Sequence, residues 1–183
     1  GPWSPDSKIL TIWNKPQSGS LSADGVGVFF YHIDTGLKTE FALSEPDYTE
    51  WEADSLILAY DENVSFSNNS SVAMLSGGGR EMFFNKEICL VEDLTKSKAQ
   101  FHAVKGILEG SLVPSMPQLS ADENILYFAA IDAEGGRKSE TPYPLKRQLY
   151  RVELGKGGEI EQLTFDAGYR NESPLLLKDE KHL

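Results

Sequence analysis

The chain has 183 residues, of which 40% are hydrophobic and 25% are charged, and its formal net charge is −11. This balance is typical of a folded domain and excludes general disorder. The acidic excess argues against a nucleic-acid binder, which needs clustered Lys and Arg, and against docking on an anionic membrane surface. No stretch approaches the roughly 20 apolar residues of a membrane span.

One short motif opens the sequence and returns three times. Each copy has an apolar residue followed by a turn with Asp near its centre, and in the first three copies an apolar run follows directly. The copies occupy residues 3–10, 51–58, 119–126 and 176–183, with the aspartates at Asp6, Asp54, Asp122 and Asp179. Because Asp can hydrogen-bond its own backbone in a turn, we expect each copy to join two antiparallel strands.

A second hairpin follows each of the first three turns. The predicted strand pairs are 28–33 with 39–43, 88–94 with 99–104, and 148–154 with 159–164. Two hairpins per repeat give four antiparallel strands, and such units are typical of β-propeller blades. No long stretch has the apolar spacing of a helix. A β-sandwich is the rival all-β fold, but it gives no reason for the Asp-centred turn to recur with the same flanks.

The motif resembles the WD40-like repeat of TolB-like propellers, in which Ser-Pro-Asp-Gly follows a Trp or an apolar residue. Residues 3–6 (Trp-Ser-Pro-Asp) match best, with Ser7 where Gly is usual. Residues 125–164 look like a blade from the N-terminal propeller of dipeptidyl peptidase IV-type peptidases. The resemblance covers most of the chain, with 61–86 as the main exception. The repeat itself predicts that Trp3 and Trp51 are core residues.

We therefore predict a single all-β repeat domain, 1–183, of propeller-type four-stranded antiparallel blades. The approximate blades are 1–45, 46–112 and 113–170, and a further blade starts at 171–183. Propellers close with four to eight blades, so the ring is expected to be incomplete, and its open edges invite pairing with a second copy.

Two long loops, 61–86 and 132–147, are expected within blades. Both should project from the same face as the links between blades, and they are the place to look for binding because long loops on a rigid scaffold often carry function. The sequence itself identifies no binding residue in them.

Motifs for chemistry are missing from the sequence. Cys89 is the single cysteine and is expected to be a buried small hydrophobe. None of the histidines, His32, His102 and His182, has a metal partner at i+2 to i+4. The Gly-Gly-Gly-Arg segment at 77–80 lacks the Gly-Lys-Ser/Thr ending of a P-loop. The segment that starts at residue 61 lacks the Gly and the Glu that a calcium-binding loop requires. No Gly-x-Ser-x-Gly nucleophile elbow occurs in the sequence. We assign no catalytic, cofactor-binding or metal-binding residue and expect no cofactor.

These observations favour a non-catalytic binding or scaffolding module for a protein or peptide. The peptidase resemblance implies that it could be the propeller portion of a prolyl-oligopeptidase-type serine peptidase, with the hydrolase domain C-terminal to it. The alternative is a propeller glycoside hydrolase or lyase that uses paired carboxylates. Acids such as Glu45, Asp47, Glu50 and Glu52 are expected to be solvated surface, and no pair stands out. A periplasmic or extracellular location is favoured over a cytoplasmic one.

Overall fold

The computed structural model of the protein describes residues 3–14, 27–43, 64–67, 72–77, 86–92, 94, 98–104, 111–132, 146–155, 158–166 and 168–177. These residues form eleven strands and no helix, which confirms the all-β prediction. The strands are β1 (Ile9–Asn14), β2 (Gly27–His32), β3 (Lys38–Leu43), β4 (Val64–Phe66), β5 (Val72–Gly77), β6 (Lys86–Glu92), β7 (Lys98–Ala103), β8 (Leu112–Leu119), β9 (Ile125–Asp132), β10 (Gln148–Glu153) and β11 (Ile160–Gln162). Since the described residues form no helix, none of them forms a helix long and apolar enough to cross a membrane.

The C-terminal strands form one complete four-stranded unit. β8, β9, β10 and β11 pair in chain order, and every pairing is antiparallel. Along β10, residues alternate between the core and the solvent: Tyr150 and Val152 are buried, whereas Arg151 and Glu153 lie on the outer side. This meander has the topology predicted for a propeller blade, and we call it unit 3.

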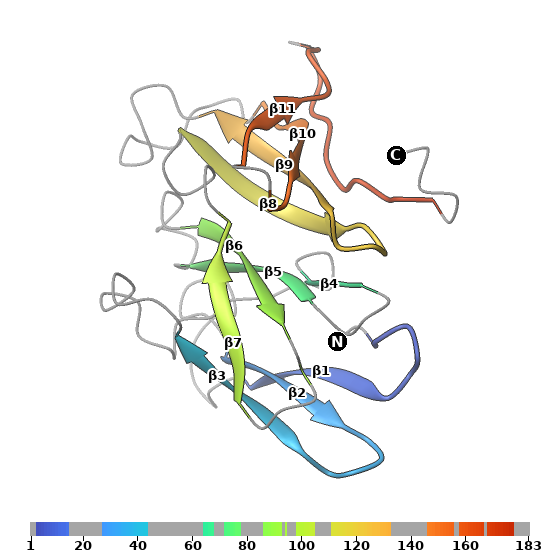
Figure 1. Ribbon diagram of the computed structural model, residues 1–183. Coiled ribbons are helices and arrows are strands. Elements are labelled where there is room, and N and C mark those ends of the chain that lie inside the picture. Colours follow the sequence, from blue (N-terminus) through green and yellow to red (C-terminus); the bar gives the residue numbers. More distant parts are fainter. Residues whose placement is uncertain are drawn as a thin grey trace.

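The other strands form a seven-stranded sheet with the order β1-β2-β3-β7-β6-β5-β4. It consists of two antiparallel groups, β1–β3 (unit 1) and β4–β7 (unit 2). They are joined by a parallel pairing of β3 with β7 that the repeat pattern did not predict. The three units follow one another in Figure 1 from blue through green to orange, and the sheets remain open, as in an incomplete ring.

Unit 2 corrects one prediction from the sequence. The segment 61–86 was expected to be a loop, but it contains β4 and β5, the first two strands of this unit. The predicted second hairpin is confirmed as β6 and β7. The motif copy around Asp54 lies outside the described residues. The blade boundaries near 45 and 112 stay a prediction, because residues 44–63 and 105–110 are not described either.

The Asp-centred turn of unit 1 is tied together by side chains. The buried Ser4 hydroxyl donates to Asp6 Oδ1 at 2.6 Å and accepts the Ile9 N–H at 2.9 Å. The Lys8 N–H donates to the same carboxylate oxygen at 3.1 Å. The turn therefore satisfies a buried hydroxyl and two backbone donors within a few residues.

The turn of unit 3 repeats this arrangement. The buried Ser120 hydroxyl donates to Asp122 Oδ1 at 2.7 Å and accepts the Ile125 N–H at 3.0 Å. The Asn124 N–H also donates to Asp122 Oδ1, at 3.1 Å. The hairpin that the sequence motif predicts is confirmed in units 1 and 3, and the serine is as much a part of it as the aspartate.

Side chains join the units to one another. Phe30 of β2 meets Phe66 of β4 edge to face, with ring centroids 5.8 Å apart. Ser65 Oγ accepts the N–H of Leu119 across units 2 and 3 at 2.9 Å. Cys89 is fully buried, as predicted. The core cluster includes Ile9, Phe30, Val64, Ile88, Cys89, Val91, Leu94, Val104, Leu119, Leu126, Phe128, Ala130, Tyr150 and Val152.

The turn geometry predicts that Ser7→Gly stabilises the protein. Ser7 has a φ of 60°, in the left-handed region that favours glycine. We expect the free energy of unfolding to rise by about 0.5–1 kcal/mol, since a side chain in this region carries a steric cost. Urea denaturation measures this. The converse control is Gly36→Ser, at a φ of 70°, which should lower the free energy of unfolding. A Ser7→Gly protein that is less stable than wild type would contradict the prediction.

An orphan hydroxyl in β1 gives a second prediction. Thr11 is buried, and its Oγ1 has no hydrogen-bond partner among the described residues. Thr11→Val keeps the shape and removes the unsatisfied oxygen, so we expect a gain of about 1 kcal/mol in unfolding free energy. The matched control is Thr39→Val, which removes a buried hydroxyl that donates to Leu94 O at 3.1 Å and should be destabilising. Equal effects of the two substitutions would refute the assignment.

Candidate functional site

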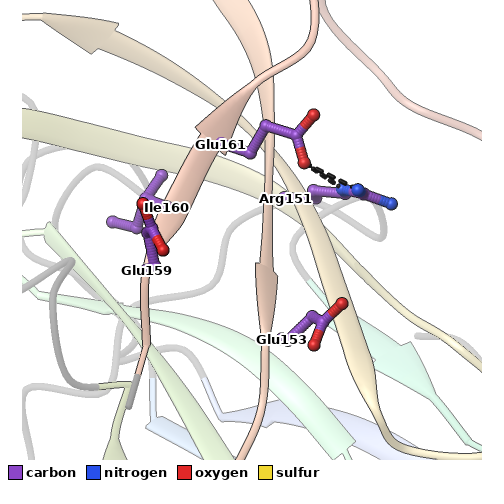
Figure 2. Close-up of a pocket in the computed structure, with 5 residues that line it drawn as sticks. All are labelled: Arg151, Glu153, Glu159, Ile160 and Glu161. Atoms are coloured by element: carbon purple, nitrogen blue, oxygen red, sulfur yellow. Dashed lines mark hydrogen bonds and ion pairs between the residues drawn. The ribbon is translucent and has the colours of Figure 1, made fainter. Parts of the chain in front are cut away.

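The outer side of unit 3 carries a surface hollow at the β10–β11 hairpin. Its volume is about 480 Å3, and it is lined by Arg151, Glu153, Glu159, Ile160 and Glu161. Figure 2 shows these side chains on the two neighbouring strands, with Arg151 and Glu161 joined by hydrogen bonds. Three carboxylates and one guanidinium leave an excess of two negative charges, so the hollow favours a cationic group.

Arg151 and Glu161 are direct cross-strand neighbours in the β10–β11 register. The Nε and Nη2 atoms of Arg151 both lie against Oε2 of Glu161, at 2.7 and 2.6 Å. This bond raises the pKa of Arg151 above its ordinary value. Since the Arg151 side chain is 36% exposed and that of Glu161 is 57% exposed, solvent screens the pair and it is worth only about 0.2–1 kcal/mol. Its main effect is to hold one side of the hollow in place.

Glu153 is the last residue of β10, and Glu159 immediately precedes β11. The register of this hairpin ends at the pair of Val152 with Ile160, so both glutamates lie just beyond it on neighbouring chain segments. Like charges gathered on one face of two neighbouring strands repel one another, and a bound cation lowers that repulsion. Together with Glu161, they make this part of the sheet surface acidic.

The repeat aspartates are structural. Hydrogen bonds from the Asn124 side chain, the Ser120 hydroxyl and the Asn124 N–H lower the pKa of Asp122 from 3.8 to about 2. The pKa of Asp6 is lowered in the same way, chiefly by the Ser4 hydroxyl and then by the Lys8 N–H. Both carboxylates are therefore fixed anions. Asp54 and Asp179 lie outside the described residues.

The histidines that are described lie in strands, as predicted. His32 is in β2, and its Nε2 lies 2.8 Å from Thr39 Oγ1. The Thr39 hydroxyl donates to Leu94 O, so it accepts from His32 Nε2–H. This chain links units 1 and 2 and gives His32 a structural role. His102 is in β7, and His182 lies outside the described residues. No group of His, Cys, Asp or Glu among the described residues is arranged to hold a metal ion.

The hollow belongs to neither of the predicted long loops. It lies on the 148–154 and 159–164 hairpin that the sequence predicts, but no residue there was singled out as a candidate. The sequence contains the information needed to find the hollow, because side chains two residues apart on a strand share a face. Residues 151 and 153 on one strand and 159 and 161 on the other therefore had to meet. Most of 132–147, from 133 to 145, lies outside the described residues.

No protein-family model and no curated protein matches this chain. Among solved structures it is similar to TolB from Acinetobacter baumannii, at 18% identity and a TM-score of 0.49, over 89% of this chain and 31% of that one. It is also similar to a putative TolB from Agrobacterium tumefaciens, at 17% identity and a TM-score of 0.48, over 87% of this chain and 46% of that one. The chain thus spans less than half the length of each.

The lowered pKa of Asp122 predicts a pH dependence. A carboxylate whose folded pKa lies below its unfolded value stabilises the fold above the unfolded pKa and loses that effect as the pH falls through the folded one. The stability advantage of wild type over Asp122→Asn should therefore be full above pH 4 and should vanish toward pH 2. Urea denaturation at a series of pH values measures it.

The control for this prediction is Asp34→Asn. The only described contact of the Asp34 carboxylate is a 3.9 Å ion pair with Lys8, with both side chains exposed. Its stability difference from wild type should be small throughout. If Asp122→Asn loses no more stability at neutral pH than at pH 2, the structural role of the carboxylate is wrong.

Proposed function

We propose that this chain is a non-catalytic β-propeller module that binds a protein or peptide. The observation that carries the proposal is the outer edge of unit 3, where a strand that ends the sheet lies beside an acidic hollow. Within the proposal, the module can serve as the propeller portion of a prolyl-oligopeptidase-type peptidase, and its open blade edges can also bind a second copy of the chain.

The edge strand supports recognition of an extended peptide. β11 is the last strand of its sheet and pairs only with β10 among the described strands. A strand at the edge of a sheet presents backbone N–H and C=O groups to which an added strand can bond. Affinity in this mode comes from the main chain, and specificity comes from pockets for alternate side chains.

The negative charge of the hollow favours a peptide that carries basic residues. An added strand beside β11 would place alternate side chains over the face that carries Glu159 and Glu161. Lys or Arg at these positions would meet the excess negative charge and relieve the repulsion between Glu153 and Glu159. The ligand class is therefore an extended segment with basic residues at alternate positions.

The paired-carboxylate alternative finds less support. A glycosidase needs a general acid whose pKa is raised, so that it carries a proton at working pH. The pKa values of the described repeat aspartates, Asp6 and Asp122, are lowered instead of raised, and that of Asp122 is about 2. Glu153 and Glu159 would be the pair for this chemistry, but they lie on the outer surface of a hairpin with no enclosed sugar cleft described around them.

Peptide binding tests the proposal directly. The probe is a fluorescein-labelled ten-residue peptide with Lys and Val alternating, compared with one in which Glu replaces Lys. Fluorescence anisotropy should show binding of the Lys peptide that weakens with added salt. Glu159→Lys should weaken it by about fivefold, the size of one exposed ion pair, and Glu159→Lys with Glu161→Lys should weaken it further and favour the Glu peptide.

The matched control is Asp34→Lys, which makes the same charge change on the exposed β2–β3 turn of unit 1. Its affinity for the Lys peptide should stay close to wild type. If Asp34→Lys and Glu159→Lys weaken binding equally, the interaction depends on net charge and not on this hollow. If no peptide binds at low salt, the proposed site is wrong.

A further inference from the structure

The main-chain groups of β11 alternate between its partner strand and the edge of the sheet. The N–H of Leu163, the residue after β11, donates to Leu149 O on β10 at 2.7 Å, so the backbone of Leu163 faces β10. Because successive residues of a strand direct their main-chain groups to opposite sides, Glu161 also faces β10. The main-chain groups of Ile160 and Gln162 therefore face the edge, where β11 has no second neighbour among the described strands.

A side chain occupies the next group along this edge. By the same alternation, the carbonyl that faces the edge after that of Gln162 belongs to Thr164. Gln162 Nε2 donates to Thr164 O at 2.6 Å. The Thr164 hydroxyl is fixed as well, since it donates to Gln148 Oε1 at 2.8 Å and accepts the Leu149 N–H at 2.9 Å. An added strand therefore finds this carbonyl already bonded, and the open part of the edge ends at Gln162.

The backbone closes the other end of the edge. Gly158 has a φ of 73°, in the left-handed region, so the chain there leaves the extended conformation that strand pairing requires. Glu159 lies between this glycine and the start of β11. The edge that a partner can use thus runs only from Glu159 to Gln162. A short edge strand with closed ends restricts which chains can pair with a sheet.

The alternation also determines which residue of an added strand lies beside the acidic hollow. Ile160 and Gln162 offer hydrogen bonds to the edge, whereas Glu161 between them does not. In an antiparallel pair, the residue opposite Glu161 therefore forms a non-hydrogen-bonded pair, in which the two Cα atoms are about 4.5 Å apart and the side chains are closest. Since Glu161 and Glu159 both line the hollow, basic side chains opposite these two positions meet its negative charge.

We propose that Gln162 sets the end of the bound peptide strand. The peptide pairs antiparallel with β11, as the strands of unit 3 pair with one another, and its main chain bonds only to Ile160 and Gln162. One basic residue lies opposite Glu161, and the next lies two positions toward the peptide C-terminus, opposite Glu159. This inference rests on the proposed peptide binding and deepens it, because it assigns the direction, the register and the end of the bound segment.

Methylation of the peptide backbone tests the register. The probe is fluorescein-labelled Thr-Val-Lys-Val-Lys, and fluorescence anisotropy at low salt measures its affinity. N-methylation of either Val removes an N–H that faces β11, so we expect the affinity to fall by about fivefold or more. N-methylation of the central Lys removes an N–H that faces away from β11 and should change the affinity by less than about twofold. The reverse pattern is that of a parallel pairing and would overturn the assigned register.

The substitution Gln162→Met tests the end of the bound strand. It keeps the length of the side chain and removes the amide that occupies Thr164 O. Adding Val-Thr to the N-terminus of the probe should change the affinity for wild type by less than about twofold, because no open main-chain group remains there. For Gln162→Met, the same extension should raise the affinity about fivefold, since an N–H of the added residues can donate to Thr164 O.

The matched control is Gln118→Met on β8, the strand farthest from β11 in the same sheet. Gln118 Nε2 also donates to a nearby carbonyl, Pro117 O, at 3.2 Å, so this variant loses a similar bond away from the site. Its affinities for both probes should equal those of wild type. Far-ultraviolet circular dichroism verifies folding, and Gln162→Leu replaces Gln162→Met if the latter unfolds.

The outcomes separate this inference from the proposed function. If wild type gains as much from the extension as Gln162→Met does, the role of Gln162 is wrong while peptide binding stands. The same holds if the ten-residue Lys peptide binds and the five-residue probe does not, since the bound segment is then longer than the open edge. If neither peptide binds wild type at low salt, the proposed function itself is wrong.

Discussion

The serine hydroxyl at the start of the Asp-centred turns of units 1 and 3 is the contact on which the rest of the structure depends. It is buried, so it needs both an acceptor and a donor to offset the loss of water. Asp6 or Asp122 supplies the acceptor, and the N–H of the first residue of the strand after the turn supplies the donor. This sets the register of the hairpin, and the register decides which side chains face the next unit.

In unit 2 the serine at the corresponding position makes a contact between units. Ser67 follows Phe66 as Ser120 follows Leu119, and it is equally buried, but its hydroxyl donates to Glu123 of the next unit. The serine that closes a local turn in units 1 and 3 thus connects two units here. The same small side chain serves both purposes because each leaves its oxygen satisfied within the core.

Sequence reasoning succeeded where a motif is local and failed where strand identity depends on partners. The Asp-centred turns and three of the hairpins follow from residues close together in the chain. β4 and β5 were missed because Ser and Asn dominate 65–71 between and around them, a composition typical of loops. The pairing of β5 with β6 and of β4 with β5 makes them strands. Trp3, which the repeat predicts to be core, is 51% exposed. The charges around Glu159 come together only through the pairing of β10 with β11, which a single repeat does not reveal.

The parallel pairing of β3 with β7 has a consequence for how the chain folds. β3 is made early, but its partner strand lies about 60 residues further along the chain, so the contact is strongly non-local and slow to form. Until β7 arrives, the outer edge of unit 1 remains an unpaired strand that any extended chain can join. Units 1 and 2 then share one continuous hydrogen-bonded sheet, so the two should melt as one cooperative body, while unit 3, a separate sheet, is free to open first.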